Sequence, residues 1–142
     1  MTFKLHEQTR DDEFAGIIDC ENAGYSEPFN GFWEILRGPS AEELTERQTM
    51  WHSLDPSSRW LYVTDEATGQ VVGAMEWNIY EENPYADGVP DFPADWWPED
   101  SPLRKISDYV LKEFLKDRPH VMGKPHVRMY PKTSTTSQHN TI

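Results

Sequence analysis

The sequence contains a single cysteine, Cys20, and no long apolar run. One cysteine excludes an internal disulfide and a cluster of thiolate metal ligands. The opening residues, MTFKLHE, lack the apolar core of a secretory signal, and no later stretch is long and apolar enough to span a membrane. We therefore expect a soluble, cytoplasmic protein without a membrane partner, with the nucleus as the open alternative.

Basic residues are also scarce. The chain has 13 Lys and Arg against 25 Asp and Glu, which gives a formal net charge of -12. A surface this acidic repels the phosphates of nucleic acids and of anionic membranes, so the sequence predicts neither as a partner. The acidic excess has two interpretations: it attracts a cationic amine toward a cleft, or it only keeps the chain in solution.

Aromatic residues are plentiful, with six each of Trp, Tyr and Phe. Such side chains bury large apolar areas, and 142 residues fit one domain with a core of its own. We predict a domain over residues 1–130. Residues 131–142 are polar and of low complexity, which predicts a disordered tail.

Sequence patterns predict the elements of this domain. They are a strand over residues 2–8, a helix capped by Thr9, a short helix over 27–36, a helix from a capping box at Ser40 and Glu43 to Asp55, strands over 59–65 and 70–80, a helix over 102–117, and a strand over 126–130 that ends at Pro131. Four prolines argue against regular structure in residues 81–100. This order of strands and helices is generic by itself and is compatible with an α/β protein of the α+β kind.

The hairpin over residues 59–80 carries the clearest pattern. Its strands are rich in strand-favouring residues, and the second one alternates between two faces over its whole length. We predict that this hairpin forms the centre of the fold. The side chains expected to be buried are Trp60, Tyr62, Met75 and Trp77.

Six short stretches, in this order, carry a resemblance to a known family. They are residues 27–30 (EPFN), 59–64 (RWLYVT), 69–77 (GQVVGAMEW), 83–85 (NPY), 96–99 (WWPE) and 124–127 (KPHV). Together they resemble the N-terminal half of fungal GNAT-type acyl-CoA N-acyltransferases over roughly residues 2–127. The resemblance implies a mixed, mostly antiparallel sheet with helices on both sides, truncated after the fourth strand.

The resemblance also implies a co-substrate, acetyl-CoA or another acyl-CoA, and a small-molecule amine as acceptor. The strand that begins at His126 and Val127 would bind the pantetheine arm through its backbone and lead into a glycine-rich loop for the pyrophosphate. This chain has no glycine after Gly123. We therefore expect no tight binding of acyl-CoA and no turnover by this polypeptide.

Several residues are candidates for the acceptor site. Glu76 shares a strand face with Asn78 and Tyr80 and is the candidate general base, the alternative being a hydrogen-bonded strand residue. The candidates for substrate binding are Phe29, Trp33, Asn78, Tyr80 and Trp97. The aromatic ones have core or lid packing as their alternative role. The spacing of the five histidines matches no zinc pattern, so no metal is expected.

Three hypotheses for the whole chain remain open at this point. It descends from acyl-transferring GNAT proteins, or it is a non-enzymatic remnant that binds the acceptor, or it is the product of a truncated gene model. The resemblance implies a sheet that continues beyond the strand over 126–130, so in this sequence we expect one edge of that strand and apolar surface of the helix over 102–117 to be exposed. We therefore expect self-association through the exposed sheet edge.

Overall fold

The computed structural model describes residues 2–26 and 28–134. The elements are, in chain order, β1 (Phe3–Glu7), α1 (Glu13–Tyr25), α2 (Gly31–Arg37), α3 (Ala41–Leu54), β2 (Ser58–Asp65), β3 (Val71–Tyr80), α4 (Pro102–Leu115), α5 (Arg118–Val121) and β4 (His126–Ser134). None of these helices is long and apolar enough to cross a membrane. Most of the predicted tail, residues 135–142, lies outside the described residues.

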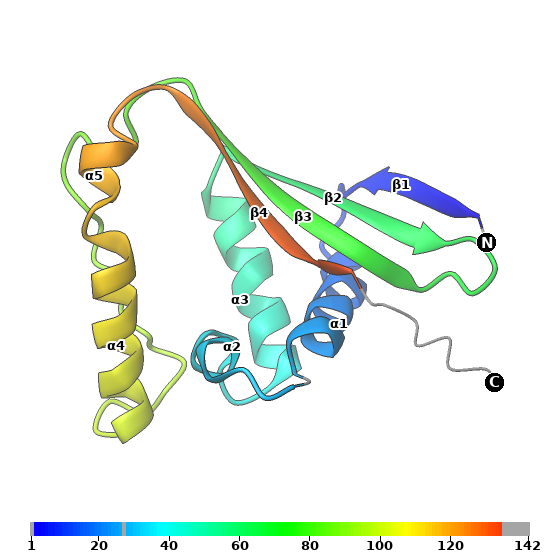
Figure 1. Cartoon of the computed structure of the whole chain (residues 1–142), viewed down its shortest axis with the longest axis horizontal. Helices are drawn as coiled ribbons and strands as arrows, with labels where there is room; N and C mark the ends of the chain where they lie inside the picture. Colours follow the sequence, from blue (N-terminus) through cyan, green and yellow to red (C-terminus); the bar gives the residue numbers. More distant parts are fainter. Residues whose placement is uncertain (1, 27, 135–142) are drawn as a thin grey trace.

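The four strands form one sheet in the order β1-β2-β3-β4, in which every neighbouring pair is antiparallel (Figure 1). This confirms the predicted α+β class with a mostly antiparallel sheet. The β2–β3 hairpin lies at the centre of the sheet, as the sequence predicted. Its strands pair from Ser58 opposite Asn78 to Thr64 opposite Val71.

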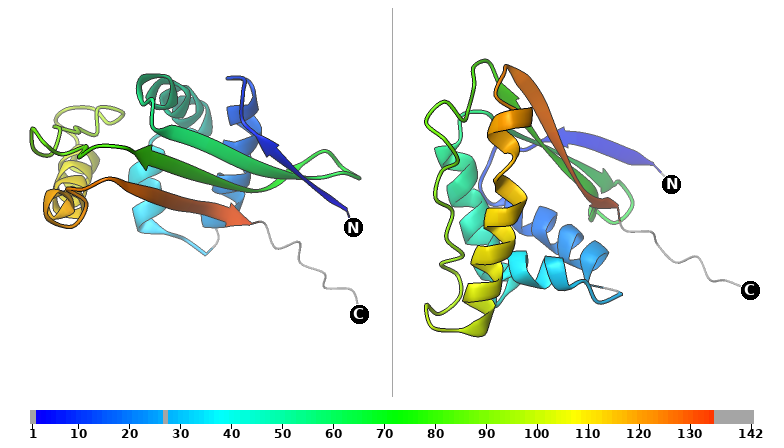
Figure 2. Two further views of the ribbon diagram at one scale, coloured as in Figure 1. Left: turned by 90° about the horizontal axis from the view of Figure 1, so that it is seen from above. Right: turned by 60° about the vertical axis from the view of Figure 1, so that its left-hand side comes forward.

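The core lies on one face of the sheet, under α1 and α3 (Figure 2). Phe14 and Ile17 of α1 pack against Trp60 and Tyr62 of β2, and the rings of Phe14 and Trp60 meet edge to face at 5.4 Å. Edge-to-face contact is a favoured geometry for aromatic pairs, and these four side chains are buried. The predicted burial of Trp60 and Tyr62 is confirmed.

Met75 and Trp77 were also predicted to be well buried, but they are only half-buried. The register explains the difference, because Trp60 and Tyr62 pair with Glu76 and Ala74. Met75 and Trp77 therefore point to the opposite face, since side chains alternate along a strand.

That opposite face carries many apolar side chains with no helix packed over them in the described part of the chain. The expectation of helices on both sides is therefore wrong for the described elements (Figure 1). Large exposed fractions mark its apolar side chains: Phe3 54%, Leu5 65%, Ile79 50%, Val127 57% and Met129 47%. The sheet thus has one covered and one bare face.

Local signals set the helix starts, although not always the ones predicted. Ser40 caps α3 by accepting a 3.1 Å hydrogen bond from the N–H of Glu43, as expected. Thr9 does not cap α1; instead Glu13 reaches back and accepts from the N–H groups of Thr9 and Arg10, at 2.8 and 3.0 Å. The short helix α2 begins at Gly31, not at residue 27, because the Asn30 side chain caps it.

The last strand does not end at Pro131 as predicted, but continues to Ser134. Proline has no N–H to donate, so inside a sheet it is tolerated at an edge or a bulge. Both conditions hold here: β4 is an edge strand of the described sheet, and its register with β3 shifts between Pro131 opposite Met75 and Thr133 opposite Ala74.

The segment from 81 to 125 leaves the sheet after β3 and returns to it as β4, carrying α4 and α5 (Figure 1). The loop before α4 is fixed by Trp96 and Trp97, whose indole N–H groups donate to the carbonyl of Ile35 at 3.0 and 3.3 Å. The guanidinium of Arg47 on α3 lies 4.2 Å over the ring of Trp96. These contacts hold α4 beside α2, at a distance from the sheet.

Candidate functional site

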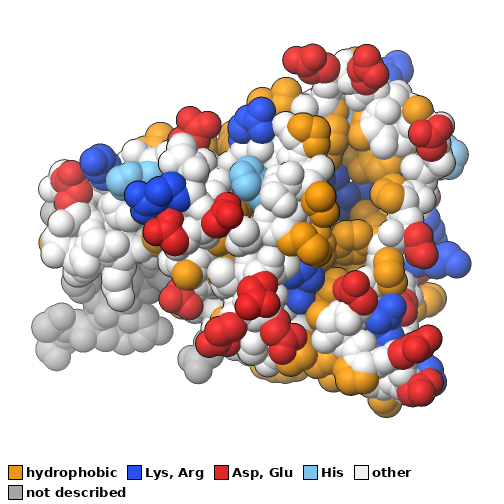
Figure 3. Space-filling model, turned by 180° about the vertical axis from the view of Figure 1, so that it is seen from behind, with side chains coloured by type: hydrophobic (Ala, Val, Ile, Leu, Met, Phe, Trp, Pro, Cys, Tyr) orange, Lys and Arg blue, Asp and Glu red, His pale blue; other side chains and the backbone are white. Residues whose placement is uncertain are grey.

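A cavity of about 840 Å³ lies between the helix-covered face of the sheet and α4. Its walls come from α1, α2, α3, β3, α4, α5, β4 and the 81–100 loop. Figure 3 shows the hollow, lined mostly by hydrophobic side chains. Its volume falls in the range typical of small-molecule sites.

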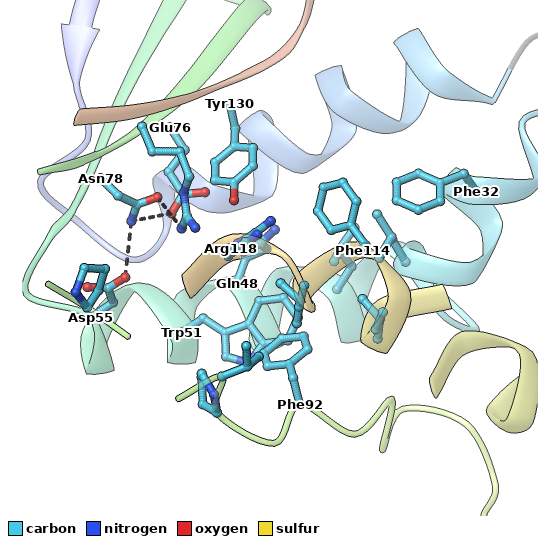
Figure 4. Close-up of a pocket in the computed structure, with 18 of the residues that line it drawn as sticks. Phe32, Gln48, Trp51, Asp55, Glu76, Asn78, Phe92, Phe114, Arg118 and Tyr130 are labelled. Atoms are coloured by element: carbon cyan, nitrogen blue, oxygen red, sulfur yellow. Dashed lines mark hydrogen bonds between the residues drawn. The ribbon is translucent and has the colours of Figure 1, made fainter. Parts of the chain in front are cut away.

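Polar groups concentrate on the sheet wall, and Asn78 lies at their centre (Figure 4). Asn78 is 1% exposed. Its Nδ2 donates to Asp55 Oδ2 at 3.2 Å and to Ser57 Oγ at 3.3 Å, while its Oδ1 accepts from Arg128 Nη2 at 3.0 Å. Both ends of the amide are satisfied, so its orientation is fixed.

Arg128 of β4 is held by neutral acceptors. Besides Asn78, Nη2 donates to Tyr80 Oη at 3.0 Å and Nη1 donates to Tyr85 Oη at 3.2 Å. The guanidinium lies 4.5 Å from the ring centroid of Tyr130. Its Nε is buried without a hydrogen-bond partner among the described residues. Within this part of the chain no carboxylate comes within ion-pair distance of Arg128.

Glu76 of β3 is next to this cluster. Its Oε1 accepts from Ser58 Oγ at 3.1 Å and, more weakly, from Asn78 Nδ2 at 3.5 Å. Ser58 is in turn 3.0 Å from Nδ1 of His52. For Oε2, the described residues supply no hydrogen bond. One oxygen of Glu76 is therefore anchored, and the other is available to a ligand.

The phenol of Tyr130 connects Glu76 with the two arginines of the cavity. The pKa of Tyr130 is raised above its ordinary value, chiefly by burial and also by the charge of Glu76. The nearby Arg128 and Arg118 act in the opposite direction and lower it. The guanidinium of Arg118, at the start of α5, lies 6.0 Å from the ring centroid of Tyr130 and 4.8 Å from that of Phe114. All three charged groups thus act on one phenol inside the cavity.

The wall opposite the polar groups is aromatic (Figure 4). The rings of Trp51 and Phe92 lie 5.0 Å apart, and those of Phe32 and Phe114 lie 6.0 Å apart. An aromatic wall facing a few fixed polar groups is the usual build of a small-molecule site.

Four of the candidates from the sequence meet in this cavity. Glu76, Asn78, Tyr80 and Trp33 all line it. The structure does not bring Phe29 or Trp97 there. Phe29 is 81% exposed and precedes the cap residue Asn30, so it lies outside α2, whereas Phe32 in the first turn of that helix lines the cavity. Trp97 packs with the loop, which matches its alternative role in lid packing.

His126 and Val127 do not line the cavity. Val127 points to the bare face of the sheet, and His126 packs against Tyr80 at 5.0 Å, with Nδ1 2.7 Å from the carbonyl oxygen of Lys124. The same strand instead contributes Arg128 and Tyr130 to the cavity.

Sequence reasoning missed Arg128, Tyr130, Asp55 and Arg118 as site residues. The first two had a usable signal, since an antiparallel pairing of residues 126–130 with β3 places them opposite Asn78 and Glu76. Asp55 follows α3 and Arg118 begins α5, two helices that are not neighbours in the sequence. No local sequence pattern marks either residue. No group of three or more His, Cys, Asp or Glu side chains suited to a metal ion occurs in residues 2–26 and 28–134.

No protein-family model matches the chain, and no curated protein matches it. Among solved structures, the chain is similar to glucosamine-6-phosphate N-acetyltransferase from Arabidopsis thaliana, with 19% sequence identity and a TM-score of 0.38. The match covers 87% of this chain and 78% of that one. It is a likeness of backbone arrangement and assigns no role to any residue of this chain.

Proposed function

We propose that this chain is the acceptor-binding part of a GNAT-type N-acyltransferase fold, and that its cavity binds a small amine with an apolar substituent. The carboxylate of Glu76 receives the ammonium group, and the aromatic wall receives the apolar part. The observation that carries the proposal is the half-anchored carboxylate of Glu76 on a cavity wall that faces aromatic rings.

The charge pattern supports a cationic ligand at Glu76. The chain as a whole carries a net charge of -12, and this field favours the approach of cations. Ser58 and Asn78 fix one oxygen of the carboxylate, so the other keeps a defined direction. A charge-assisted hydrogen bond from an ammonium group is among the stronger polar contacts available in a protein.

The same geometry suits a general base. A carboxylate within hydrogen-bond reach of a bound ammonium group can take its proton, which leaves the neutral amine needed to attack a thioester carbon. We propose this role for Glu76 in a protein that also holds acyl-CoA. For the 142-residue polypeptide itself we propose binding without turnover, because no glycine follows Gly123 to let backbone N–H groups approach a pyrophosphate.

The test is calorimetric titration with phenethylamine and with 2-phenylethanol, which has a hydroxyl group in place of the amine. Phenethylamine should bind and the alcohol should bind at least about tenfold more weakly, as expected for loss of a charge-assisted contact. Glu76→Gln should remove this preference. Glu82→Gln, at an exposed position outside the cavity, is the matched control and should keep it. Equal binding of the amine and the alcohol to the natural protein would refute the proposal.

A further inference from the structure

The cavity contains more positive charge than an amine site needs. Arg118 and Arg128 both line it, and neither is within ion-pair distance of a carboxylate in the described residues. The carboxylates that share the lining are Glu21, Asp55 and Glu76. In a chain with 25 acidic and 13 basic residues, two arginines that form no ion pair with a described residue inside one cavity are a distinct local feature.

The two arginines differ in how they are held. Both terminal nitrogens of Arg128 donate hydrogen bonds, to Asn78, Tyr80 and Tyr85, so its guanidinium is a positive charge with a fixed position in the cavity wall. The described contacts of Arg118 are with the faces of the Phe114 and Tyr130 rings, at 4.8 and 6.0 Å from their centroids. A guanidinium has five N–H donors, so Arg118 keeps donors for a ligand.

Opposite charges are therefore displayed close together. The guanidinium of Arg118 lies 6.0 Å from the ring centroid of Tyr130, Tyr130 is the residue directly opposite Glu76 in the pairing of β4 with β3, and all three line the cavity. A ligand beside Tyr130 thus has a carboxylate acceptor for a cation on one side and a guanidinium for an anion on the other. Arg118 suits a carboxylate, because a guanidinium matches the planar geometry of that group.

We propose that the ligand of this cavity is an amino-acid zwitterion with a large apolar side chain. Its ammonium group lies on Oε2 of Glu76, its carboxylate on Arg118, and its side chain on the aromatic wall formed by Trp51, Phe92, Phe32 and Phe114. Arg128 is a positioning residue, which holds Asn78 and Tyr80 and adds to the positive field. This inference rests on the proposed function and narrows its acceptor from amines in general to α-amino acids.

Three related probes separate the contributions. L-phenylalanine carries both charges, phenethylamine carries only the ammonium group, and 3-phenylpropionate carries only the carboxylate. Titration calorimetry on the natural protein should give the tightest binding for L-phenylalanine. We expect each single-charge analogue to bind at least about tenfold more weakly than L-phenylalanine, because each has lost one charge-assisted contact.

Variants then assign each charge. Arg118→Gln should weaken L-phenylalanine to the level of phenethylamine and leave phenethylamine unchanged. Lys124→Gln, which removes an exposed charge from the segment that follows α5, is the matched control and should change neither. Glu76→Gln should weaken both ligands, and far-ultraviolet circular dichroism of each variant checks that it is folded.

Each result supports or overturns the inference. If phenethylamine binds as tightly as L-phenylalanine and Arg118→Gln changes neither, the zwitterion inference fails while the amine proposal stands. If neither amine binds, the proposed function fails, and the inference fails with it. If 3-phenylpropionate alone binds, the cavity is an anion site and both proposals are wrong.

Discussion

Arg128 of β4 donates a hydrogen bond of 3.0 Å to the side-chain oxygen of Asn78, the residue directly opposite it on β3. The nitrogen of the same amide donates to Asp55 at 3.2 Å. One buried amide therefore joins a cation and an anion from two distant parts of the chain. Its oxygen turns toward the cation and its nitrogen toward the anion, so only one of its two orientations satisfies both neighbours.

Replacing this amide should cost stability as well as binding. Asn78→Leu has nearly the same shape but leaves Arg128 and Asp55 each with one contact fewer. We expect a loss of about 1–3 kcal/mol in the free energy of unfolding, the range for a buried polar group left unsatisfied. Denaturant unfolding measures it, with Ile79→Val on the bare face as the control, and an unchanged midpoint for Asn78→Leu would contradict the role assigned to the amide.

Glu13 should make the protein sensitive to acid. The N–H groups of Thr9 and Arg10 and the hydroxyl of Tyr62 hold the pKa of Glu13 below its ordinary value of 4.5. A lowered folded-state pKa contributes stability that is fully present above the unfolded pKa and is lost as pH falls through the folded one. The loss should therefore come below pH 4.5.

Glu13→Gln tests this directly. The variant should be less stable than the natural protein at neutral pH, and the gap should narrow as the pH falls from 4.5. Thermal unfolding across that range is the measurement. Glu46→Gln, at an exposed position on α3, is the control, and its unfolding temperature should change with pH in the same way as that of the natural protein. A constant gap for Glu13→Gln would show that Glu13 contributes no pH-dependent stability.

The bare face of the sheet should promote self-association. Ile79 and Val127 lie directly opposite each other on this face, 50% and 57% exposed. Changing both to Thr keeps the branched shape that strands favour and lowers the apolar area. We expect sedimentation velocity to show concentration-dependent association for the natural protein and less of it for the double variant. Val121→Thr, exposed on α5, should behave like the natural protein, and a natural protein that stays monomeric at every concentration would argue against this role.

The 142-residue polypeptide should not turn over acyl-CoA. Calorimetric titration with acetyl-CoA should show no saturable binding below the millimolar range, where weak non-specific contacts begin. No free CoA thiol should appear when an amine that binds the cavity is added. Binding of the amine alone in the same preparation shows that the protein is folded, and micromolar binding of acetyl-CoA would contradict the prediction.

The sequence predicted the parts of this molecule that follow from local chemistry. Alternation along residues 70–80 identified the central strand, and Ser40 with Glu43 marked the start of α3. Glu76, Asn78 and Tyr80 were found because a strand places alternate residues on one face. Asp55 and Arg118 escaped notice because tertiary packing alone brings them to the cavity. Phe29 was misplaced because α2 begins four residues later than predicted, which leaves Phe29 before the helix and puts Phe32 in the cavity lining.

The long excursion between β3 and β4 also has a kinetic consequence. Strands β3 and β4 are hydrogen-bonded neighbours, and Tyr80 at the end of β3 pairs with His126 at the start of β4. In the sequence, the whole segment that carries α4 and α5 lies between these two residues. Closing so long a loop costs more entropy than closing the short turn between β2 and β3. Contacts that are distant in sequence slow folding, so we expect the central hairpin to form early and β4 to join it late. The cavity then exists only after the last strand has docked, and a folding intermediate that lacks β4 has no ligand site.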